Sequence, residues 1–395
     1  MDYKQEGVLP VGLKKAVGAE VFVFLFLFLG FFILVGREMG MANMFSTMME
    51  TAYALLMDTV FYIMAIAVLA GAISALFSEF GVIALLNKLL SRVVSVVYGL
   101  PGACAVGIFT TYLSDNPAIL TLANDNDFRR YFKKYQLPAL TNVGTAFGMG
   151  LIITTFMASL RSPVGEHFGT AVLIGNLGAV AGSIVSTRLM LRYTAKVFGK
   201  DAPCDLDEGA ENIDINRFRK VRHGSVGLRF MDALLAGGKN GVEMGLSIVP
   251  GVLIICTLVL MLTNGVPAGG YTGAAYEGIG FLPMVGEKLN FLIMPLFGFS
   301  SPEAISVPIT AMGAAGAAIG LVEKLVAAGL SNAHDIAVFT AMCMCWSGYL
   351  STHVAMMDSL KCSYLTGVAI ACHTLGGIVA GVVANWAFNL VMLFS

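Results

Sequence analysis

The sequence predicts an all-α membrane protein that crosses the bilayer several times, and three observations lead to this fold class. The 395-residue chain is 57% hydrophobic but only 12% charged, with a mean hydropathy of +0.80. Soluble domains carry about 25% charged residues. Apolar runs of the length that a transmembrane helix needs, about 20 residues, recur along the chain. The 45 glycines suit membrane helices that pack closely through small residues.

Seven apolar runs predict transmembrane helices. They cover residues 17–36, 51–77, 138–160, 167–191, 241–263, 336–357 and 364–392. The first run lacks a small-residue cleavage site, so we expect a retained helix and not a signal peptide. The chain then divides into an N-terminal tail with the first helix (1–50), a first helical unit (51–192), a basic loop (193–240) and a second helical unit (241–395).

Two further regions, 80–124 and 286–325, are ambiguous, because each joins an amphipathic stretch to another apolar segment. Lys and Arg gather on the cytoplasmic side of membrane proteins. Three segments are basic: the N-terminus, 125–136 with four Lys or Arg, and 188–239 with ten. All three can be cytoplasmic only if 101–124 enters and leaves the membrane on the same side.

The segment TYLSDNPAILTLANDND, residues 111–127, fits such a re-entrant hairpin. It places Ser114, Asp115, Asn116 and Pro117 together within an apolar region. Irregular backbone at membrane depth is tolerated only where protein or a water-filled cavity surrounds it. We therefore expect a hairpin that enters from the cytoplasm. The N-terminus is then cytoplasmic. Loop 264–285, which contains no Lys or Arg, faces outside.

The second ambiguous region resembles the first, which suggests a duplication. With Pro101 set on Pro302, GLPGACAVGIFTTYLSDNPAIL lies over SSPEAISVPITAMGAAGAAIG without a gap. Upstream, Asp58 falls opposite Glu243, and two predicted helices follow each hairpin. The first unit starts outside and the second inside, so the sequence predicts an inverted repeat with about seven transmembrane helices and two re-entrant hairpins. Inverted repeats with interrupted segments are typical of secondary transporters, which bind substrate near the midplane.

This order of elements, with GLPG at 99–102 and SDNP at 114–117, resembles the nucleoside-recognition "Gate" domain over about residues 51–392. Concentrative nucleoside transporters, the membrane core of ferrous-iron transporters and the spore maturation membrane proteins share that domain. In the nucleoside transporters the first hairpin contacts base and ribose, with sodium near its tip, so the resemblance places Asp115 and Asn116 there. The second hairpin differs from that pattern, because GAAGAAIG at 313–320 carries no polar side chain. The resemblance also implies a homo-oligomer, a trimer or a dimer.

Polar side chains inside the apolar segments are the candidate binding residues, because an ionisable group at the centre of a membrane helix costs about 2.5 kcal/mol or more. The candidates for substrate binding are Ser114, Asp115, Asn116, Asn142, Thr145, Asn176, Trp346, Tyr349 and His353. The candidates for ion coupling are Asp58, Asp115, Glu243, His353, Asp358 and His373. Trp346, Tyr349 and His353 are spaced by three and four residues, so we expect them on one face of a helix.

Each candidate also has a purely structural interpretation. Ser114, Asp115 and Asn116 are residues that cap helix starts. Amides and imidazoles in membrane helices often form interhelical hydrogen bonds. Asp58 and Glu243 lie close enough to the ends of their runs to be solvated there.

The sequence gives little support to several other functions. A net charge of -1 does not suggest a nucleic-acid partner. Cys343 and Cys345 point to different faces of a helix, which does not suit a metal chelate, and no nucleotide, zinc or nucleophile motif suggests an enzyme. We expect a secondary transporter in the cell inner (plasma) membrane for a small polar organic solute, nucleoside-like or a related metabolite. Sodium or protons would be the coupling ion, with no cofactor or bound metal. The alternative is a non-transporting membrane scaffold or a subunit of a larger complex.

Overall fold

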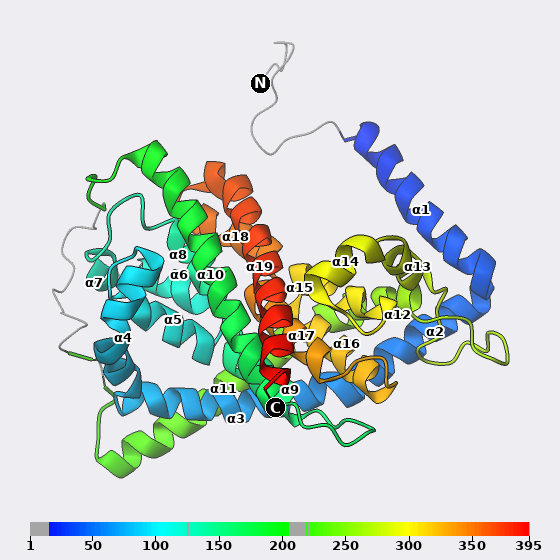
Figure 1. The fold of residues 1–395 in the computed structure, drawn as a ribbon, viewed down its shortest axis with the longest axis horizontal. Helices are drawn as coiled ribbons and strands as arrows, with labels where there is room; N and C mark the ends of the chain where they lie inside the picture. The colour runs from blue at the N-terminus through cyan, green and yellow to red at the C-terminus, as the bar shows by residue number, and fades with distance from the viewer. Residues whose placement is uncertain (1–15, 125, 205–217, 220, 395) are drawn as a thin grey trace.

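A computed structural model describes residues 16–124, 126–204, 218–219 and 221–394. Within those residues the chain forms helices and connecting loops without a β-strand, which confirms the predicted all-α class. Helix α1 (Ala19–Met39) projects from the body of the molecule and exposes most of its apolar side chains (Figure 1). Most of the predicted N-terminal tail and much of the predicted basic loop lie outside the described residues.

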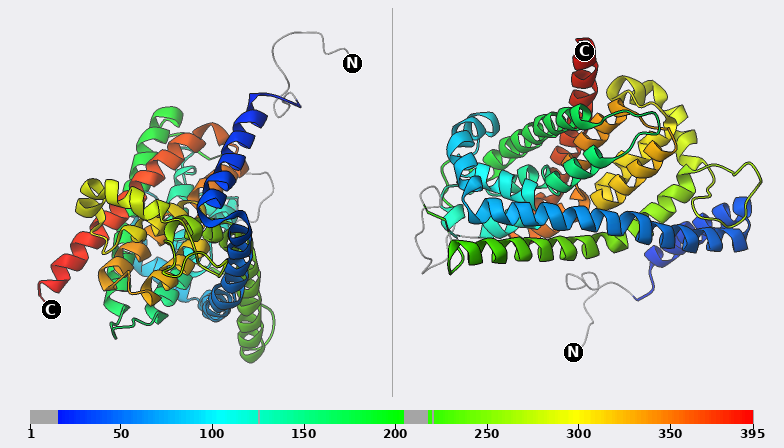
Figure 2. Two further views of the ribbon diagram at one scale, coloured as in Figure 1. Left: turned by 90° about the vertical axis from the view of Figure 1, so that its right-hand side faces the viewer. Right: turned by 90° about the horizontal axis from the view of Figure 1, so that it is seen from below.

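Two long helices run side by side along one edge of the molecule (Figures 1 and 2). The first is built from α2 (Met41–Ala54), a π-helical turn η1 (Leu55–Val60) and α3 (Phe61–Glu79). The second is built from α11 (Val226–Pro250), a π-helical turn η2 (Gly251–Cys256) and α12 (Thr257–Thr263). Gly71 of α3 and Gly237 of α11 lie so close that a Cβ on either would overlap the other's backbone carbonyl. Small residues therefore set this close packing.

The centre of the molecule is formed by α10 (Gly169–Phe198) and α19 (Thr366–Met392), which cross each other through glycine contacts. Helix α17 (Ala333–Cys345) packs against both and is buried from Asp335 to Cys345. These three helices therefore form the middle layer against which the remaining short helices lie.

The short helices follow the same order in the two halves of the chain. The first half contains α4 (Val82–Tyr98), α5 (Cys104–Leu113), α6 (Pro117–Asn124), α7 (Asn126–Arg129), α8 (Ala139–Thr145) and α9 (Gly150–Ser159). The second contains α13 (Phe281–Lys288), α14 (Asn290–Phe297), η3 (Pro302–Ile305), α15 (Ser306–Gly313), α16 (Ala315–Ala327), the helix α17 named above, α18 (Tyr349–Ser359) and η4 (Ser363–Leu365). The inverted relation of the two halves across a membrane stays a prediction.

Several boundaries differ from those predicted. The predicted helix 51–77 is part of a longer span, Met41–Glu79, and α11 begins at Val226 instead of residue 241. The second amphipathic stretch forms two short helices, α13 and α14, where one was expected. Asp58 lies inside η1, whereas Glu243 lies in α11 ahead of η2, so the two acids do not occupy equivalent positions.

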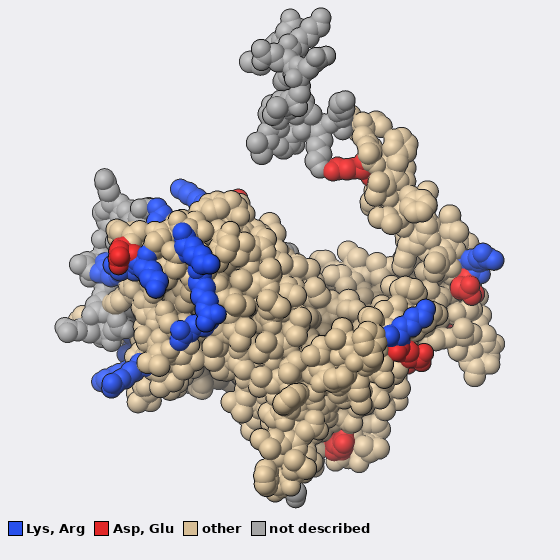
Figure 3. Space-filling view, turned by 45° about the horizontal axis from the view of Figure 1, so that its top comes forward, with Lys and Arg blue, Asp and Glu red and all other residues tan. Residues whose placement is uncertain are grey.

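The described residues contain five helical stretches that are long and apolar enough to cross a membrane. A further pair, Asn290–Phe297 and Pro302–Gly313, passes the same test together but bends by 79° at its break. Lys and Arg side chains gather at the end of the molecule that carries α4 and the C-terminal part of α10, on an otherwise mostly uncharged surface (Figure 3). Exposed members of this group are Lys88, Arg92, Arg188, Arg192 and Lys196. The chain is thus a multi-pass membrane protein with its positive charge concentrated at one end.

Candidate functional site

The structure places a pair of helices joined by a short break at each predicted hairpin. In hairpin 1, α5 and α6 pack against each other, with Gly107 of the first helix against Ile119 of the second. In hairpin 2, α15 packs against α16. The break in hairpin 1 consists of Ser114–Asn116, whereas in hairpin 2 only Ala314 lies between the helices, in an extended conformation.

The tips of the two hairpins meet at one cavity of about 320 Å³. Its lining residues are Asp115, Asn116, Met149, Gly251, Ile255, Gly313, Ala314, Ala315, Gly316, Ala317, Ser347, Gly348 and Thr352. The gapless overlay of the two hairpin sequences sets Asp115 on Gly316, and both positions line this cavity. The hairpin tips therefore come together in the structure as the duplicated pattern predicts.

Two predicted transmembrane helices are broken at the same cavity, and this was not predicted. The run 138–160 divides into α8 and α9, and the run 336–357 divides into α17 and α18. The residue before each second helix has a left-handed conformation: Met149 with φ 55° and Gly348 with φ 60°. The glycines in GMG (148–150) and SGY (347–349) are the sequence signals that could have indicated these breaks.

Hydrogen bonds hold the break between α17 and α18 between the two hairpins. Asn116 Nδ2 of hairpin 1 donates to the carbonyl oxygen of Ser347 at 2.7 Å. The N–H of Gly348, the next residue, donates to the carbonyl oxygen of Ala311 in hairpin 2 at 3.0 Å. Gly148, in the other break, packs directly on Asn116, and a Cβ there would overlap Asn116 Oδ1. The four irregular segments thus form one connected unit.

Several polar groups at the cavity have no partner within the described part of the chain. Asn116 is 6% exposed, and its Oδ1 atom accepts no hydrogen bond from the described residues. Asp115 Oδ1 accepts from the N–H of Asn116 at 2.7 Å, and no described Lys or Arg forms an ion pair with this carboxylate. Helix α16 begins without a side-chain cap. Buried polar groups of this kind are costly unless a ligand satisfies them.

Three other predicted residues lie in interhelical hydrogen bonds away from the cavity lining. Asn142 Nδ2 donates to Ser186 Oγ and to the Ala369 carbonyl, which joins α8 to α10 and α19. Asn176 joins hairpin 1, α9 and α10 through Tyr112 and Thr154. Thr145 is fully buried, and its hydroxyl donates to the sulfur of Met356. Ser114 Oγ donates to the Thr110 carbonyl within hairpin 1.

Trp346, Tyr349, His353 and His373 form a buried aromatic group, and none of them lines the cavity. The helix breaks between Trp346 and Tyr349, yet their rings lie 6.1 Å apart, and the two imidazole rings lie 4.6 Å apart. His373 bonds to Ser186 and to the Cys345 carbonyl. His353 Nδ1 must donate to the Tyr349 carbonyl, so its Nε2 is a buried acceptor without a described partner. From the same segment, the residues that do line the cavity are Ser347, Gly348 and Thr352.

The remaining three acids predicted for ion coupling are exposed and lie outside the cavity lining. Asp58 faces outward from η1. The side chain of Glu243 is 65% exposed and lies 3.9 Å from Lys239. Asp358, at the end of α18, accepts a hydrogen bond from Ser363. Their positions are those of solvated or lipid-facing acids, and a role in coupling stays a prediction.

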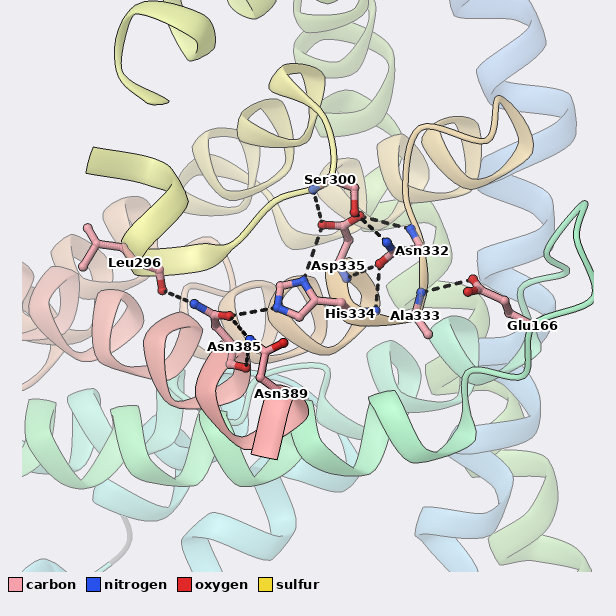
Figure 4. Close-up of polar contacts among 9 residues, drawn as sticks. All are labelled: Glu166, Leu296, Ser300, Asn332, Ala333, His334, Asp335, Asn385 and Asn389. Carbon is pink, nitrogen blue, oxygen red and sulfur yellow. Dashed lines mark hydrogen bonds and ion pairs between the residues drawn. The ribbon is translucent and has the colours of Figure 1, made fainter. Parts of the chain in front are cut away.

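A second polar cluster surrounds the start of α17 and was not predicted (Figure 4). Asn332 Oδ1 accepts from the N–H groups of His334 and Asp335, and Asp335 accepts in return from the N–H of Asn332, which completes a capping box. Asp335 also accepts from the N–H of Ser300, at the start of hairpin 2, at 3.0 Å. His334 Nε2 bonds to Asn385 of α19 at 2.9 Å.

The cavity beside this cluster, about 610 Å³, is larger than the one at the hairpin tips. Its polar groups, however, bond mainly to one another. The Asp335 carboxylate accepts two backbone hydrogen bonds, from Ser300 and Asn332, and lies 3.9 Å from His334 Nδ1. Asn385 bonds to His334, Leu296 and Asn389. Burial lowers the pKa of His334, but the neighbouring Asp335 and Asn385 raise it further, so that the net pKa lies above its usual value. We interpret the cluster as an anchor for hairpin 2, α17 and α19.

No protein-family model and no curated protein matches the chain. Solved structures do match. The fold resembles that of CNTnw, a concentrative nucleoside transporter. One CNTnw variant in an outward-facing state is 15% identical, with a TM-score of 0.53 over 93% of this chain and 82% of that one. A second outward-facing variant is 14% identical, with a TM-score of 0.51 over 94% and 84%.

A third CNTnw variant, in a state called intermediate 1, is 13% identical, with a TM-score of 0.54 over 93% of this chain and 84% of that one. The similarity extends over nearly the whole chain. The fold of the chain is therefore similar to that of these CNTnw structures, in keeping with the resemblance seen in the order of elements.

Proposed function

We propose that this protein is a secondary active transporter whose substrate, a small polar organic solute, binds between the tips of hairpins 1 and 2. One observation carries this proposal: two hairpin tips and two helix breaks, drawn from both halves of the chain, surround one polar cavity. Transporters bind substrate where discontinuous helices meet, because the unpaired backbone groups there bind ligands. The similarity to CNTnw in more than one state supports a transport role.

Alternating access then depends on movement of the hairpins or of the two halves around this cavity. Hairpin 2 touches the rest of the site through backbone contacts and small side chains, which favours movement of its tip. Because CNTnw is a nucleoside transporter, nucleosides and related metabolites belong in the first screen. We place the protein as a homo-oligomer in the plasma membrane, with α1 in contact with lipid.

Sodium or protons would drive the transport. Sodium is a hard cation that suits the oxygen atoms of Asp115, Asn116 and nearby carbonyls. Protons suit His353, whose Nε2 atom is a buried acceptor without a described partner. Among the described residues, the rings that contact His353 are those of Tyr349 and His373, and no described carboxylate bonds to the His353 imidazole.

Uptake into proteoliposomes tests the proposal. Vesicles with an inward sodium gradient, an inward proton gradient or no gradient are exposed to a defined mixture of nucleosides, amino acids and organic acids, and their contents are measured by mass spectrometry. We expect at least one solute to accumulate only with a gradient. Asp115→Asn should reduce accumulation at least about tenfold, whereas Asp201→Asn, at an exposed loop position, should not. Equal contents with and without gradients would contradict secondary transport.

A further inference from the structure

We propose that the substrate is a small zwitterion, such as an amino acid, whose ammonium group binds at the tip of hairpin 1 and whose carboxylate binds at the start of α16 in hairpin 2. This inference rests on the proposed function, because it assigns a substrate class to the cavity between the tips. It follows from the opposite electrostatic character of the two tips, since one presents acceptors and the other presents donors.

The tip of hairpin 1 is the electronegative side of the cavity. Asp115 lines the cavity, and no described Lys or Arg neutralises it. Asn116 directs its amide group, through Nδ2, to the Ser347 carbonyl, which leaves Oδ1 as a buried acceptor without a described donor. A substrate ammonium group supplies both the missing positive charge and the missing donors.

The start of α16 is the electropositive side. Ala314 precedes this 13-residue helix and has no side chain that could cap it. The N–H groups of Ala315, Gly316 and Ala317 have no acceptor among the described residues, and all three residues line the cavity. The first N–H groups of a helix and its macrodipole favour an anion. A substrate carboxylate accepts from two or more of these N–H groups.

The rest of the lining suits a small substrate without a large aromatic ring. Met149 and Ile255 are its large apolar members, and the described lining contains no Phe, Tyr or Trp. A nucleobase would therefore lack an aromatic partner on which to stack. The nearby stack of Trp346 and Tyr349 lies behind the helix break and outside the lining. A volume of about 320 Å³ accommodates an amino acid with a small or medium side chain.

Thermal unfolding of the purified full-length protein tests this inference, because a ligand that binds only the folded state raises the melting temperature. The probes are the twenty L-amino acids, β-alanine and γ-aminobutyrate, each compared with its amide, which lacks the carboxylate, and with the corresponding acid without the amine. Uridine and adenosine complete the set. Every probe is measured in sodium and in potassium buffer.

We expect at least one amino acid to raise the melting temperature. Its amide and its amine-free acid should need at least about thirtyfold higher concentrations for the same shift, because each leaves one buried group unpaired. The inference would be overturned if uridine, adenosine or either truncated analogue raised the melting temperature at the same concentrations as the amino acid. An amine-free acid that acts fully in sodium buffer alone would show that sodium, and not a substrate amine, occupies the site at Asp115.

Two substitutions test the two halves of the site separately. Asp115→Asn removes the charge that binds the ammonium group. Ala314→Asp places a carboxylate at the N-cap of α16, where it bonds to the free N–H groups in place of the substrate. Because a cap stabilises its helix, Ala314→Asp should unfold at the wild-type temperature or above without ligand and yet lose the response to the amino acid. Gly169→Asp, which adds an acid at the start of α10 in open space, is the matched control.

These results can be separated from failure of the proposed function. If no amino acid shifts the melting temperature, or if both variants keep the response, the zwitterion site is wrong even where uptake of another solute shows that the protein is a transporter. If an amino acid binds and both variants lose it, but no gradient drives its uptake, the zwitterion site stands and secondary transport is wrong.

Discussion

Hairpin 1 turns through three polar residues, Ser114–Asn116, whereas hairpin 2 turns through a single alanine, Ala314. Hairpin 1 is fixed to the α17–α18 break by a side chain, through the bond from Asn116 to the Ser347 carbonyl. Hairpin 2 is fixed to the same break by backbone alone, through the bond from the Gly348 N–H to the Ala311 carbonyl. The same architecture therefore presents an acidic tip on one side of the cavity and an uncapped helix on the other.

The proposed zwitterion site depends on this difference between the two tips. Both tips retain the irregular backbone that a membrane site needs, so the shape of the site comes from the architecture that the halves share. The chemical selectivity comes from the few residues in which the tips differ. Substitutions that remove this difference should therefore change binding, while equivalent substitutions away from the tips should not.

The largest effect is expected from Gly148→Ala. A Cβ at this position would overlap Asn116 Oδ1, so the tip of hairpin 1 must shift. Misplacement of a binding group by about 1 Å can cost about a hundredfold in activity, and we expect proteoliposome uptake to fall by about that factor. The matched control is Gly367→Ala at the start of α19, away from both tips, where an added Cβ would meet nothing within 4 Å. Equal uptake by the two variants would show that hairpin 1 is not held in place by this contact.

A smaller effect is expected from Asn116→Ala. This change removes the donor to the buried Ser347 carbonyl, and an unsatisfied buried acceptor costs about 1–3 kcal/mol. The melting temperature should fall accordingly. Ser114→Ala, which removes only a bond to the Thr110 carbonyl within the same hairpin, should lower it less. If the order of the two variants is reversed, the bond across the site is not what stabilises hairpin 1.

His334 should make the anchor of hairpin 2 sensitive to pH. The folded-state pKa of His334 lies above the unfolded value of about 6.5, because Asp335 and Asn385 outweigh the effect of burial. Its contribution to stability is then fully present below the unfolded pKa and is lost as the pH rises through the folded pKa. Melting temperatures of wild type and His334→Gln should differ most at low pH. A difference that grows with rising pH would contradict this assignment.

The smallest effect is expected from Glu243→Gln. The Glu243–Lys239 pair is exposed, with a separation of 3.9 Å, and exposed pairs contribute about 0–1 kcal/mol. Stability should therefore stay close to that of wild type. Proteoliposome uptake by the same variant tests whether Glu243 couples ions. We expect uptake to depend on the gradient as in wild type. A clear loss of this dependence in a stable variant would show that the exposed acid takes part in coupling.

Much of the architecture could be predicted from local sequence. Composition and run length indicated the membrane class, and GLPG, SDNP and the repeated order of elements indicated two hairpins with Asp115 and Asn116 at the first tip. The breaks at Met149 and Gly348 were missed, because each lies in an apolar run that a continuous helix would also explain. The pairing of Asn116 with Ser347 joins residues 231 positions apart, and local pattern does not predict such a contact.

The electropositive half of the proposed site was missed for a different reason. Sequence reasoning looks for polar side chains, and GAAGAAIG has none. The donors there are the backbone N–H groups of Ala315, Gly316 and Ala317, which become available only because α16 starts at the cavity without a cap. For the same reason Trp346, Tyr349 and His353 were predicted to bind substrate. In the structure they form a ring cluster that does not line the cavity.

The central claim is that substrate binds where the two tips meet, and thiol labelling of Ala314→Cys tests it most directly. Cys204 and Cys362, which are partly exposed, are first replaced by serine, and Ala327→Cys at the exposed far end of α16 is the control. We predict that labelling of Ala314→Cys with N-ethylmaleimide abolishes uptake of the solute found in the proteoliposome screen. The same solute should slow the labelling reaction. Labelled Ala327→Cys should still take up the solute. Full uptake by labelled Ala314→Cys would contradict the claim.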